Sequence, residues 1–319
     1  MNIELPGDVQ CAVALSYDLE MCAGYSPSMV NHGHIIPDLQ KYTLTLCDIA
    51  ESYDVILHFF YVTNGLEAEN IDYLKEIINR GHVIDSHTYS HVSLATDDEE
   101  LLDSELKKAN QLLAEKLGIK SKVLRGPGGI INGLNDYPVA QKVILENGFR
   151  YVSSAYKDPL THNGFHYINS DYKRSLTDKD LQNAAQLTTF DPPYRYQSGL
   201  IEIPMHGLTD RNWFDMHYCI RPDEFNEWRR VKGHQPVATD WCAPWTAPDA
   251  LDKWIQYNLD LLDRVYQEKA LWVPVWHPYT HYLHDRQNIA LKSLLEFSVS
   301  KPKKVWICTL RDVINMLRS

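Results

Sequence analysis

The sequence of 319 residues lacks long apolar segments, and it has no cationic start followed by an apolar stretch. A transmembrane helix needs about 18 or more consecutive apolar residues, and a secretory signal needs an apolar core behind a basic start. Neither pattern occurs in the sequence. We therefore expect a protein with no integral membrane segment and a cytoplasmic location.

Paired cysteines and long basic runs are missing as well. None of the six cysteines belongs to a C-x-x-C pair, which predicts reduced, mostly buried thiols and argues against a disulfide framework or a cysteine zinc site. The chain has 31 basic and 42 acidic residues, and its only Lys-rich run is the short segment Lys301–Lys304. Because proteins that bind a nucleic-acid backbone normally carry a basic footprint, we expect no nucleic-acid partner.

Short apolar segments alternate with amphipathic ones along the chain. The expected strands are 10–18, 54–62, 82–86, 122–125, 149–154, 200–204, 271–276 and 304–308. The expected helices are 37–52, 70–80, 97–117, 138–147, 247–268 and 287–300. In the clearest helix, Thr96 and Glu99 predict a capping box at the start and Gly118 predicts the end. This alternation is typical of a parallel sheet closed or nearly closed into a barrel, here as one domain over residues 1–319.

The alternation weakens between about residues 155 and 247, where helical stripes are few and aromatic residues are many. Loops of this length in a compact domain are typical of lids or binding elements. The aromatic side chains of this excursion, Trp213 among them, are expected either to stack on a sugar ring or to anchor the excursion to the barrel.

Two histidines and two carboxylates have the spacing of metal ligands. His87 and His91 lie four residues apart beyond a predicted strand, and one helical turn would bring their rings to the same side. Asp18 and Glu20 end another predicted strand, where residues two apart share a face. A histidine pair of this kind is also common among surface or capping residues, but the carboxylate pair favours a metal site with nitrogen and oxygen ligands.

Further polar side chains follow the ends of other predicted strands. The carboxyl ends of barrel strands meet at one rim, where functional groups gather. On that rim we also expect Arg125, Ser154, His206 and His277. Asp85 is interpreted either as a hydrogen-bond partner of a ligand imidazole or as a strand-end cap. His281 and His284 are expected on the surface of the following loop.

These motifs resemble those of the polysaccharide deacetylases, the NodB-homology group of carbohydrate esterase family four. The matching segments, in family order, are Asp18-Leu-Glu20, His87-Thr-Tyr-Ser-His91, Arg125-Gly-Pro127-Gly-Gly129 and Val273-Pro-Val-Trp-His277. The resemblance covers roughly residues 10–280. It implies a NodB-type distorted (β/α) barrel related to the TIM barrel, with the aromatic-rich excursion between the fifth and seventh strands.

The sequence departs from the family pattern at two places. The first motif is D-x-E instead of adjacent aspartates, which is similar to a variant subgroup of cytoplasmic members. The family's fourth motif is not found, and Tyr151–Ser154 stands in its place. Together with the segment Leu200–Pro204, this is also similar to the allantoinase-like cyclic amide hydrolases.

The resemblance implies a hydrolase that removes an N-acetyl group from an amino sugar. Its substrate would be a small-molecule, nucleotide-linked or lipid-linked sugar. Glu20, His87 and His91 would hold one divalent transition metal, with zinc the first choice and cobalt or nickel as alternatives.

The remaining roles also follow from the resemblance. Asp18 would be the general base, His277 the general acid, and Arg125 would orient Asp18 through a bidentate contact. The implied substrate contacts are Pro127, Gly128, Ser154, His206 and Trp213. The roles of Asp18 and Glu20 could be exchanged. A cyclic amide hydrolase, an inactive carbohydrate-binding homologue and a homo-oligomeric state all stay open.

Overall fold

The computed structural model describes residues 1–20, 37–67, 71–157, 159, 178–211, 213–214 and 249–318. The middle of its main sheet is parallel and consists of β3 (Ser16–Leu19), β4 (His58–Tyr61), β5 (Val83–Ser86), β6 (Val123–Ile130) and β7 (Tyr151–Lys157). β12 (Val275–Trp276) pairs with β3 at one edge. At the other edge β9 (Ile201–Glu202) and β10 (Met205–His206) pair with β7, and β8 (Tyr194–Arg195) is antiparallel to β9.

A second parallel sheet continues the curl of the first. It consists of β11 (Leu271–Trp272), β2 (Val9–Val13) and β13 (Lys304–Ile307). The predicted strand 10–18 is thus two strands, β2 and β3, and the predicted strand 271–276 is β11 and β12. Pro274 lies at the second break, and its carbonyl accepts hydrogen bonds from the backbone N–H and the hydroxyl of Ser16. The fold is a curled parallel half barrel, which agrees with the predicted α/β barrel class.

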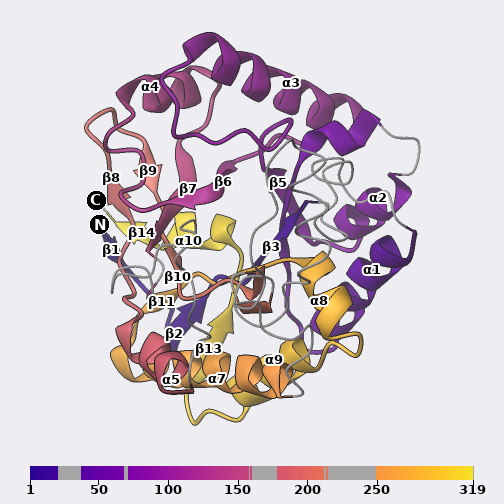
Figure 1. Ribbon diagram of the computed structural model, residues 1–319, viewed down its shortest axis with the longest axis vertical. Helices are drawn as coiled ribbons and strands as arrows, with labels where there is room; N and C mark the ends of the chain where they lie inside the picture. The colour runs from indigo at the N-terminus through magenta and orange to yellow at the C-terminus, as the bar shows by residue number, and fades with distance from the viewer. Residues whose placement is uncertain are drawn as a thin grey trace, which may run out of the picture.

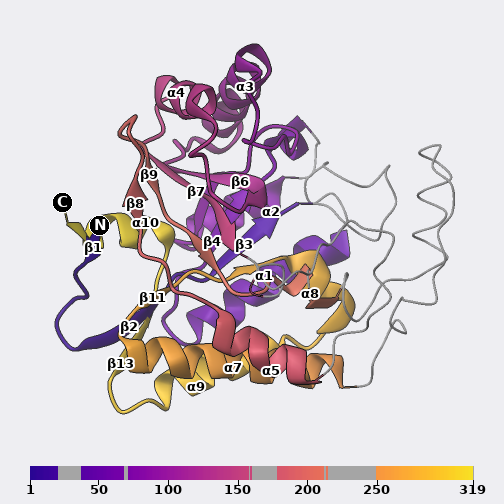
Figure 2. The same cartoon turned by 60° about the vertical axis from the view of Figure 1, so that its left-hand side comes forward.

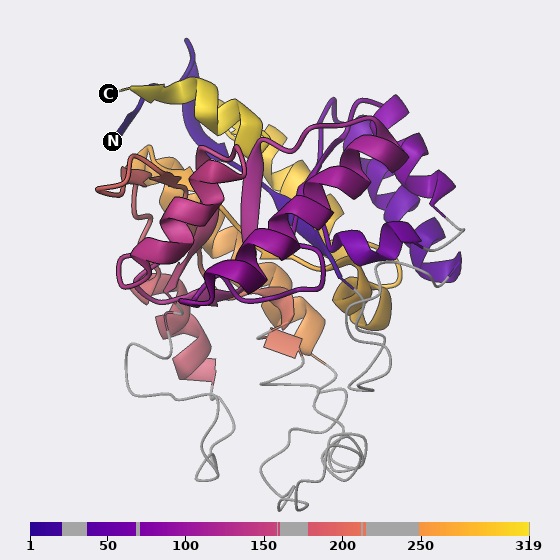
Figure 3. The same cartoon turned by 90° about the horizontal axis from the view of Figure 1, so that it is seen from above.

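Helices form an outer layer around these strands (Figure 1). The predicted helices are confirmed to within a few residues as α1 (Pro37–Glu51), α2 (Asp72–Asn79), α3 (Glu99–Leu117), α4 (Pro138–Glu146), α7 (Ala250–Glu268) and α9 (Ile289–Val299). The sequence analysis missed the elements η1 (Thr63–Glu67), α5 (Asp178–Leu187), α8 (Pro278–His284) and α10 (Leu310–Met316). α3 and α4 pack side by side on the outside of the sheet (Figure 3).

The largest buried cluster explains why the amphipathic segments are helices. Tyr17 and Leu19 of β3 pack in it with Leu46 of α1, Leu74 of α2 and Trp254 of α7. Each helix contributes the apolar stripe that the sequence predicts, and burying these stripes is the main favourable term in folding.

The predicted excursion is only partly described. Residues 158, 160–177, 212 and 215–248 lie outside the described residues, and the described part of this region contains α5 and β8 to β10. In the part of the chain that the structure describes, no helix is long and apolar enough to cross a membrane. β1 (Asn2–Ile3) pairs with β14 (Leu317–Arg318), so the two ends of the described chain lie side by side (Figure 2).

The start of α3 differs from the predicted capping box. The N-cap is Asp98, whose carboxylate accepts a hydrogen bond from the backbone N–H of Leu101. Thr96 instead accepts from the N–H of Asp98, before the helix begins. The predicted end is confirmed, because Gly118 adopts the left-handed conformation that closes many helices.

We therefore expect Asp98→Ala to lower the free energy of unfolding by about 1 kcal/mol, because the side chain is the N-cap acceptor of α3. Asp97→Ala is the matched control, since it removes a neighbouring exposed carboxylate that does not cap the helix. Urea unfolding of both variants measures the difference. Equal losses in the two variants would contradict this assignment of the cap.

Candidate active site

The end of β3 brings two carboxylates to one rim of the half barrel. Because side chains alternate along a strand, Tyr17 and Leu19 enter the apolar cluster while Asp18 and Glu20 share the opposite face. Both carboxylates are buried. The prediction that residues two apart share a face holds for this pair.

His87 and His91 follow β5 and reach the same place. The Nε2 atom of His87 lies 3.7 Å from Asp18 Oδ2 and 3.5 Å from Glu20 Oε2. Nε2 of His91 contacts Glu20 Oε2 directly. One ligand atom from each of Glu20, His87 and His91 lies within 4.8 Å of the others, so these residues form a possible three-residue metal site.

The local geometry that joins the two histidines is not the predicted helical turn. The segment from 87 to 91 is a loop in which Thr88 and His91 have positive φ angles of 64° and 65°. Nδ1 of His87 donates to the backbone carbonyl of Arg125 at 3.1 Å, which fixes the ring and leaves Nε2 facing the carboxylates. The strained loop, and not a regular helix, brings the rings together.

Glu105 of α3 holds this loop, and the sequence analysis missed it. Its carboxylate accepts hydrogen bonds from the backbone N–H groups of Tyr89 and Ser90, at 3.2 and 2.8 Å, and from the Ser90 hydroxyl at 2.6 Å. The feature of the sequence that could have indicated this role is a glutamate next to the apolar stripe of α3. Glu105 is buried, so its charge is stabilised chiefly by these donors.

Arg125 lies beside Asp18 but does not make the predicted bidentate contact. Its Nε is 3.6 Å from Asp18 Oδ1, which is longer than a hydrogen bond, while Nη2 donates to the Ser16 hydroxyl at 2.6 Å. The guanidinium stacks over the ring of Phe60 at 4.5 Å. Complete burial lowers the pKa of Arg125, and the nearby charges of Asp18 and Glu202 oppose that shift.

His277 follows β12 and is paired with Asp210, another residue that the sequence analysis missed. The ring Nδ1–H and the backbone N–H of His277 both donate to the Asp210 carboxylate at 2.7 Å. Nε2 of His277 then faces Glu20 Oε1 at 3.5 Å. Burial lowers the pKa of His277, but Asp210, Glu20 and Asp18 outweigh burial and raise it to about 9.

Because the family's fourth motif was not found, the sequence analysis offered no carboxylate in its place. In the structure, Asp210 provides a carboxylate beside His277. Asp210 follows β10, just as the predicted site residues follow the ends of their strands. This position in the sequence could have indicated that Asp210 belongs to the site. The next residue, Arg211, places Nη1 at 3.3 Å from Glu20 Oε1. His281 is completely buried on α8, with Nε2 at 3.3 Å from Asp210 Oδ2, so its expected surface position is wrong.

The predicted substrate contacts at Pro127, Gly128 and Ser154 lie near this rim. Pro127 is buried and Gly128 is exposed towards the end of β6. Ser154 is held by Glu202, which accepts hydrogen bonds from its backbone N–H and its hydroxyl at 2.6 and 2.8 Å. Gly126 packs so closely on Ser154 that a Cβ at Gly126 would approach the Ser154 Cβ to 2.7 Å. These contacts give Ser154 a structural role.

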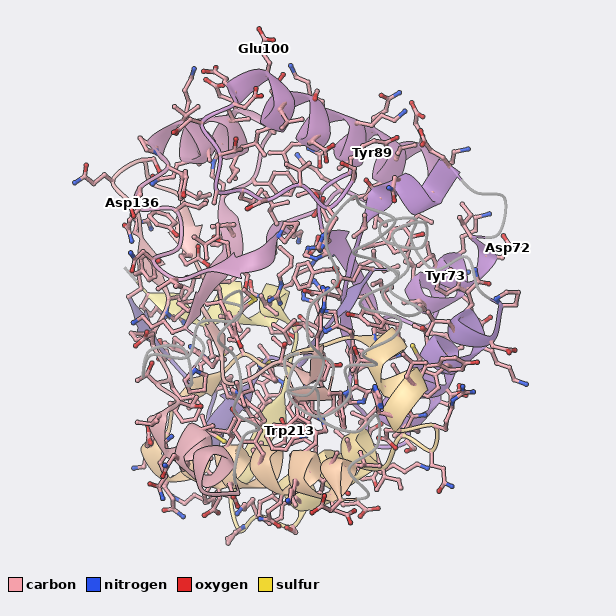
Figure 4. All side chains as sticks on the ribbon, viewed as in Figure 1. Asp72, Tyr73, Tyr89, Glu100, Asp136 and Trp213 are labelled. Carbon is pink, nitrogen blue, oxygen red and sulfur yellow. The ribbon has the colours of Figure 1, made fainter. Side chains whose placement is uncertain are left out.

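The structure places His206 and Trp213 in packing positions. The N–H of Val273 donates to Nδ1 of His206, and Nε2–H donates to the carbonyl of Asp191, each at 3.0 Å. Trp213 is fully buried, donates to the carbonyl of Ala250 and packs against α7 (Figure 4). These contacts favour structural roles over the predicted substrate contacts.

Asp85 belongs to a separate network and does not contact a metal-ligand candidate. Its carboxylate accepts hydrogen bonds from two nitrogens of Arg311, from Nε2–H of His58 and from the backbone N–H of Lys122. The predicted hydrogen bond to a ligand imidazole is therefore wrong. The carbonyl of Arg125 has that role for His87.

Comparisons with known proteins agree with this geometry. A family model described as polysaccharide deacetylase matches residues 23–151. A peptidoglycan-N-acetylglucosamine deacetylase from Bacillus cereus is 35% identical over 96 residues, which are 30% of this chain and 34% of that protein. Over residues 23–151, which are less than half of the chain, this protein is therefore similar to the polysaccharide deacetylases. The match to this curated relative spans about a third of the relative's length, so the relative's activity is not carried over to this chain.

Solved structures of similar fold cover nearly the whole chain. A crystal structure from Mycobacterium smegmatis, assigned to the polysaccharide deacetylases, has a TM-score of 0.64 at 20% identity and covers 98% of this chain and 92% of that chain. Puue allantoinase has a TM-score of 0.57 at 15% identity, with 98% and 91% covered. At these identities the likeness shows the fold alone. The family comprises hydrolases that act on C–N bonds, and a three-residue metal site is typical of it.

We expect Glu105→Ala to weaken metal binding at the three-residue site by about tenfold, because the loop that carries His91 loses its acceptor. Competition with a chromophoric chelator measures the affinity. Glu100→Ala is the control, since Glu100 lies exposed on the outer side of the same helix (Figure 4). Unchanged affinity in a folded Glu105→Ala variant would contradict the positioning role.

The structural role of His206 predicts a pH dependence of stability. Burial lowers the pKa of His206 from 6.5 to about 4, and Lys157 lowers it further against the opposing effect of Asp191. Between these values the unfolded chain binds the extra proton, so the free energy of unfolding falls as the pH drops from 6.5 towards 4. His206 contributes at most about 1.4 kcal/mol per pH unit to that fall. His206→Gln should show a shallower fall in urea titrations, and identical slopes would contradict the assignment.

Proposed function

We propose that this chain is a metal-dependent deacetylase that removes the N-acetyl group of an amino sugar. One observation carries the proposal: the converging donor atoms of Glu20, His87 and His91 lie beside Asp18 and His277 on one rim. The Bacillus cereus relative, by its name, acts on the N-acetylglucosamine of peptidoglycan, which supports an N-acetylated amino sugar as the substrate class.

The donor set fits a divalent transition metal. Two imidazole nitrogens and one carboxylate oxygen form a catalytic zinc set that keeps one position open, and cobalt and nickel accept the same donors. His87 is held in the tautomer that leaves Nε2 unprotonated, as a ligand requires. When bound, such a metal supplies a Lewis acid that polarises a carbonyl and makes water more acidic. Because Glu20 contacts His91 directly, Glu20 suits the ligand role better than Asp18.

Asp18 is placed to act as the general base. The carboxylate lies beside the ligand set, and within the described residues its Oδ1 has no hydrogen-bond partner. Arg125 places a positive charge 3.6 Å from that oxygen, which stabilises the carboxylate. Asp18 takes one proton from water as the water oxygen attacks the acetyl carbon.

His277 is placed to act as the general acid. Its pKa near 9 keeps the imidazole protonated at neutral pH, and Asp210 holds Nδ1–H so that Nε2–H faces the site. The Nε2 proton is transferred to the departing nitrogen when the C–N bond breaks. Acetate and the free amine are the products, and Asp210 keeps the ring oriented throughout.

Finer features of the proposal come from the sequence. They are a D-x-E subgroup, zinc as the metal, a cytoplasmic location, a nucleotide-linked or lipid-linked sugar as substrate and a single domain over residues 1–319. The roles of Pro127 and Gly128 in substrate binding belong to the same set. Hydrolytic activity that survives complete removal of metal, or that acts on a substrate without a sugar ring, would favour the cyclic amide hydrolase alternative.

Metal content and acetate release together test the function. We expect about one transition metal per chain in protein purified without chelator or histidine tag, as measured by elemental mass spectrometry. The double variant His87→Ala, His91→Ala should lose the metal and the activity together. A folded wild-type protein without bound metal would overturn the proposal.

The proton-transfer residues give a second, independent readout. Asp18→Asn and Asp210→Asn should keep the metal but lower kcat for release of acetate from N-acetylglucosamine oligomers by about 100-fold or more. Asp18→Asn removes the general base, and Asp210→Asn removes the partner that orients His277 and keeps it protonated. Glu100→Ala serves as the activity control. Full activity in Asp18→Asn would show that Asp18 is not the base.

A further inference from the structure

A cavity of about 340 Å³ lies at the amino ends of β6 and β7, next to α10. The proposed reaction takes place at the carboxyl ends of the strands, and Figure 2 shows α10 and α8 at opposite ends of the half barrel. We propose that this cavity binds a small organic molecule that carries a phosphate group. The cavity is separate from the candidate active site, and none of its lining residues has a role there.

The charge of the lining is the first argument. Four of its nine residues are basic, namely Lys120, Lys122, Arg150 and Arg311, and none is acidic, although acidic residues outnumber basic ones by 42 to 31 in the chain. Within the described part of the chain, Lys120, Lys122 and Arg150 form no ion pair with a carboxylate. A concave site of one sign raises the local concentration of ligands of the opposite sign.

Two of these cations are held in place before any ligand arrives. Arg311 is fixed by the buried Asp85, which accepts from Nε at 2.9 Å and from Nη2 at 2.8 Å. Nη1 of Arg150 donates to the carbonyls of Leu145 and Phe149, at 3.0 Å each. Each guanidinium keeps further N–H groups beyond these bonds, and a planar guanidinium of fixed orientation suits the oxygens of a phosphate.

The arrangement favours a dianion attached to a small organic body. The charge of Asp85 compensates Arg311, which leaves three cations for the ligand, and a phosphomonoester carries nearly two negative charges at neutral pH. The volume lies at the lower end of the range for small-molecule sites, which is about 300 to 1,000 Å³. Tyr151 and Ile314 add apolar wall, so the cavity offers a surface for more than a free phosphate ion.

Calorimetric titration of the full-length protein with glucose 6-phosphate tests the proposal, with inorganic phosphate and glucose as comparison ligands. We expect saturable binding of the sugar phosphate, at least about tenfold tighter than either comparison ligand. The double variant Lys120→Gln, Lys122→Gln should weaken it by about tenfold or more, because it removes two uncompensated charges. Neither lysine side chain holds the fold together, so the variant should fold normally.

Lys303→Gln, Lys304→Gln is the matched control, because it removes the same charge from two exposed residues at the start of β13, outside the cavity. Equal weakening in both double variants, or no binding of glucose 6-phosphate at about 10 mM, would overturn the proposal. Equal affinities for glucose 6-phosphate and inorganic phosphate would overturn the assignment of an organic phosphate. Metal content and acetate release should be unchanged in both variants, so failure here is distinguishable from failure of the proposed deacetylase function.

Discussion

The candidate site depends on the buried charge of Glu20. Its carboxylate contacts His91, lies 3.5 Å from both His87 and His277, and lies 3.3 Å from Arg211. Burial by itself raises the pKa of Glu20, but the histidines outweigh burial and hold it well below its usual range. A buried anion is tolerated only when cations or donors surround it, so three other segments of the chain converge on this carboxylate.

Other buried carboxylates hold the segments that surround Glu20. Glu105 holds the loop between the two histidines, Glu202 holds the middle of β7 at Ser154, and Asp210 holds His277. Asp85 of β5 ties α10 to the sheet through Arg311. Each carboxylate accepts several hydrogen bonds, which offsets its cost of burial and fixes backbone that apolar packing alone would leave less precisely placed.

Much of the architecture could be predicted because it follows from local patterns. Apolar periodicity placed the helices to within a few residues, and the alternation of β3 placed Asp18 and Glu20 on one face. Predictions failed where distant segments decide the outcome. The partners of His206 are the backbones of Asp191 and Val273, and the partners of Asp85 come from β4 and α10, which no local pattern reveals.

The sequence by itself determined the α/β class, the helices and the group of strand-end residues, because periodicity and motif spacing are local properties of the chain. Only the tertiary structure decided that a strained loop brings His91 to Glu20, that Asp210 orients His277, and that Arg125 approaches Asp18 with a single nitrogen. These contacts join residues far apart in the chain. Their geometry is therefore set by how the strands curl and how buried charges find partners, which residue spacing does not encode.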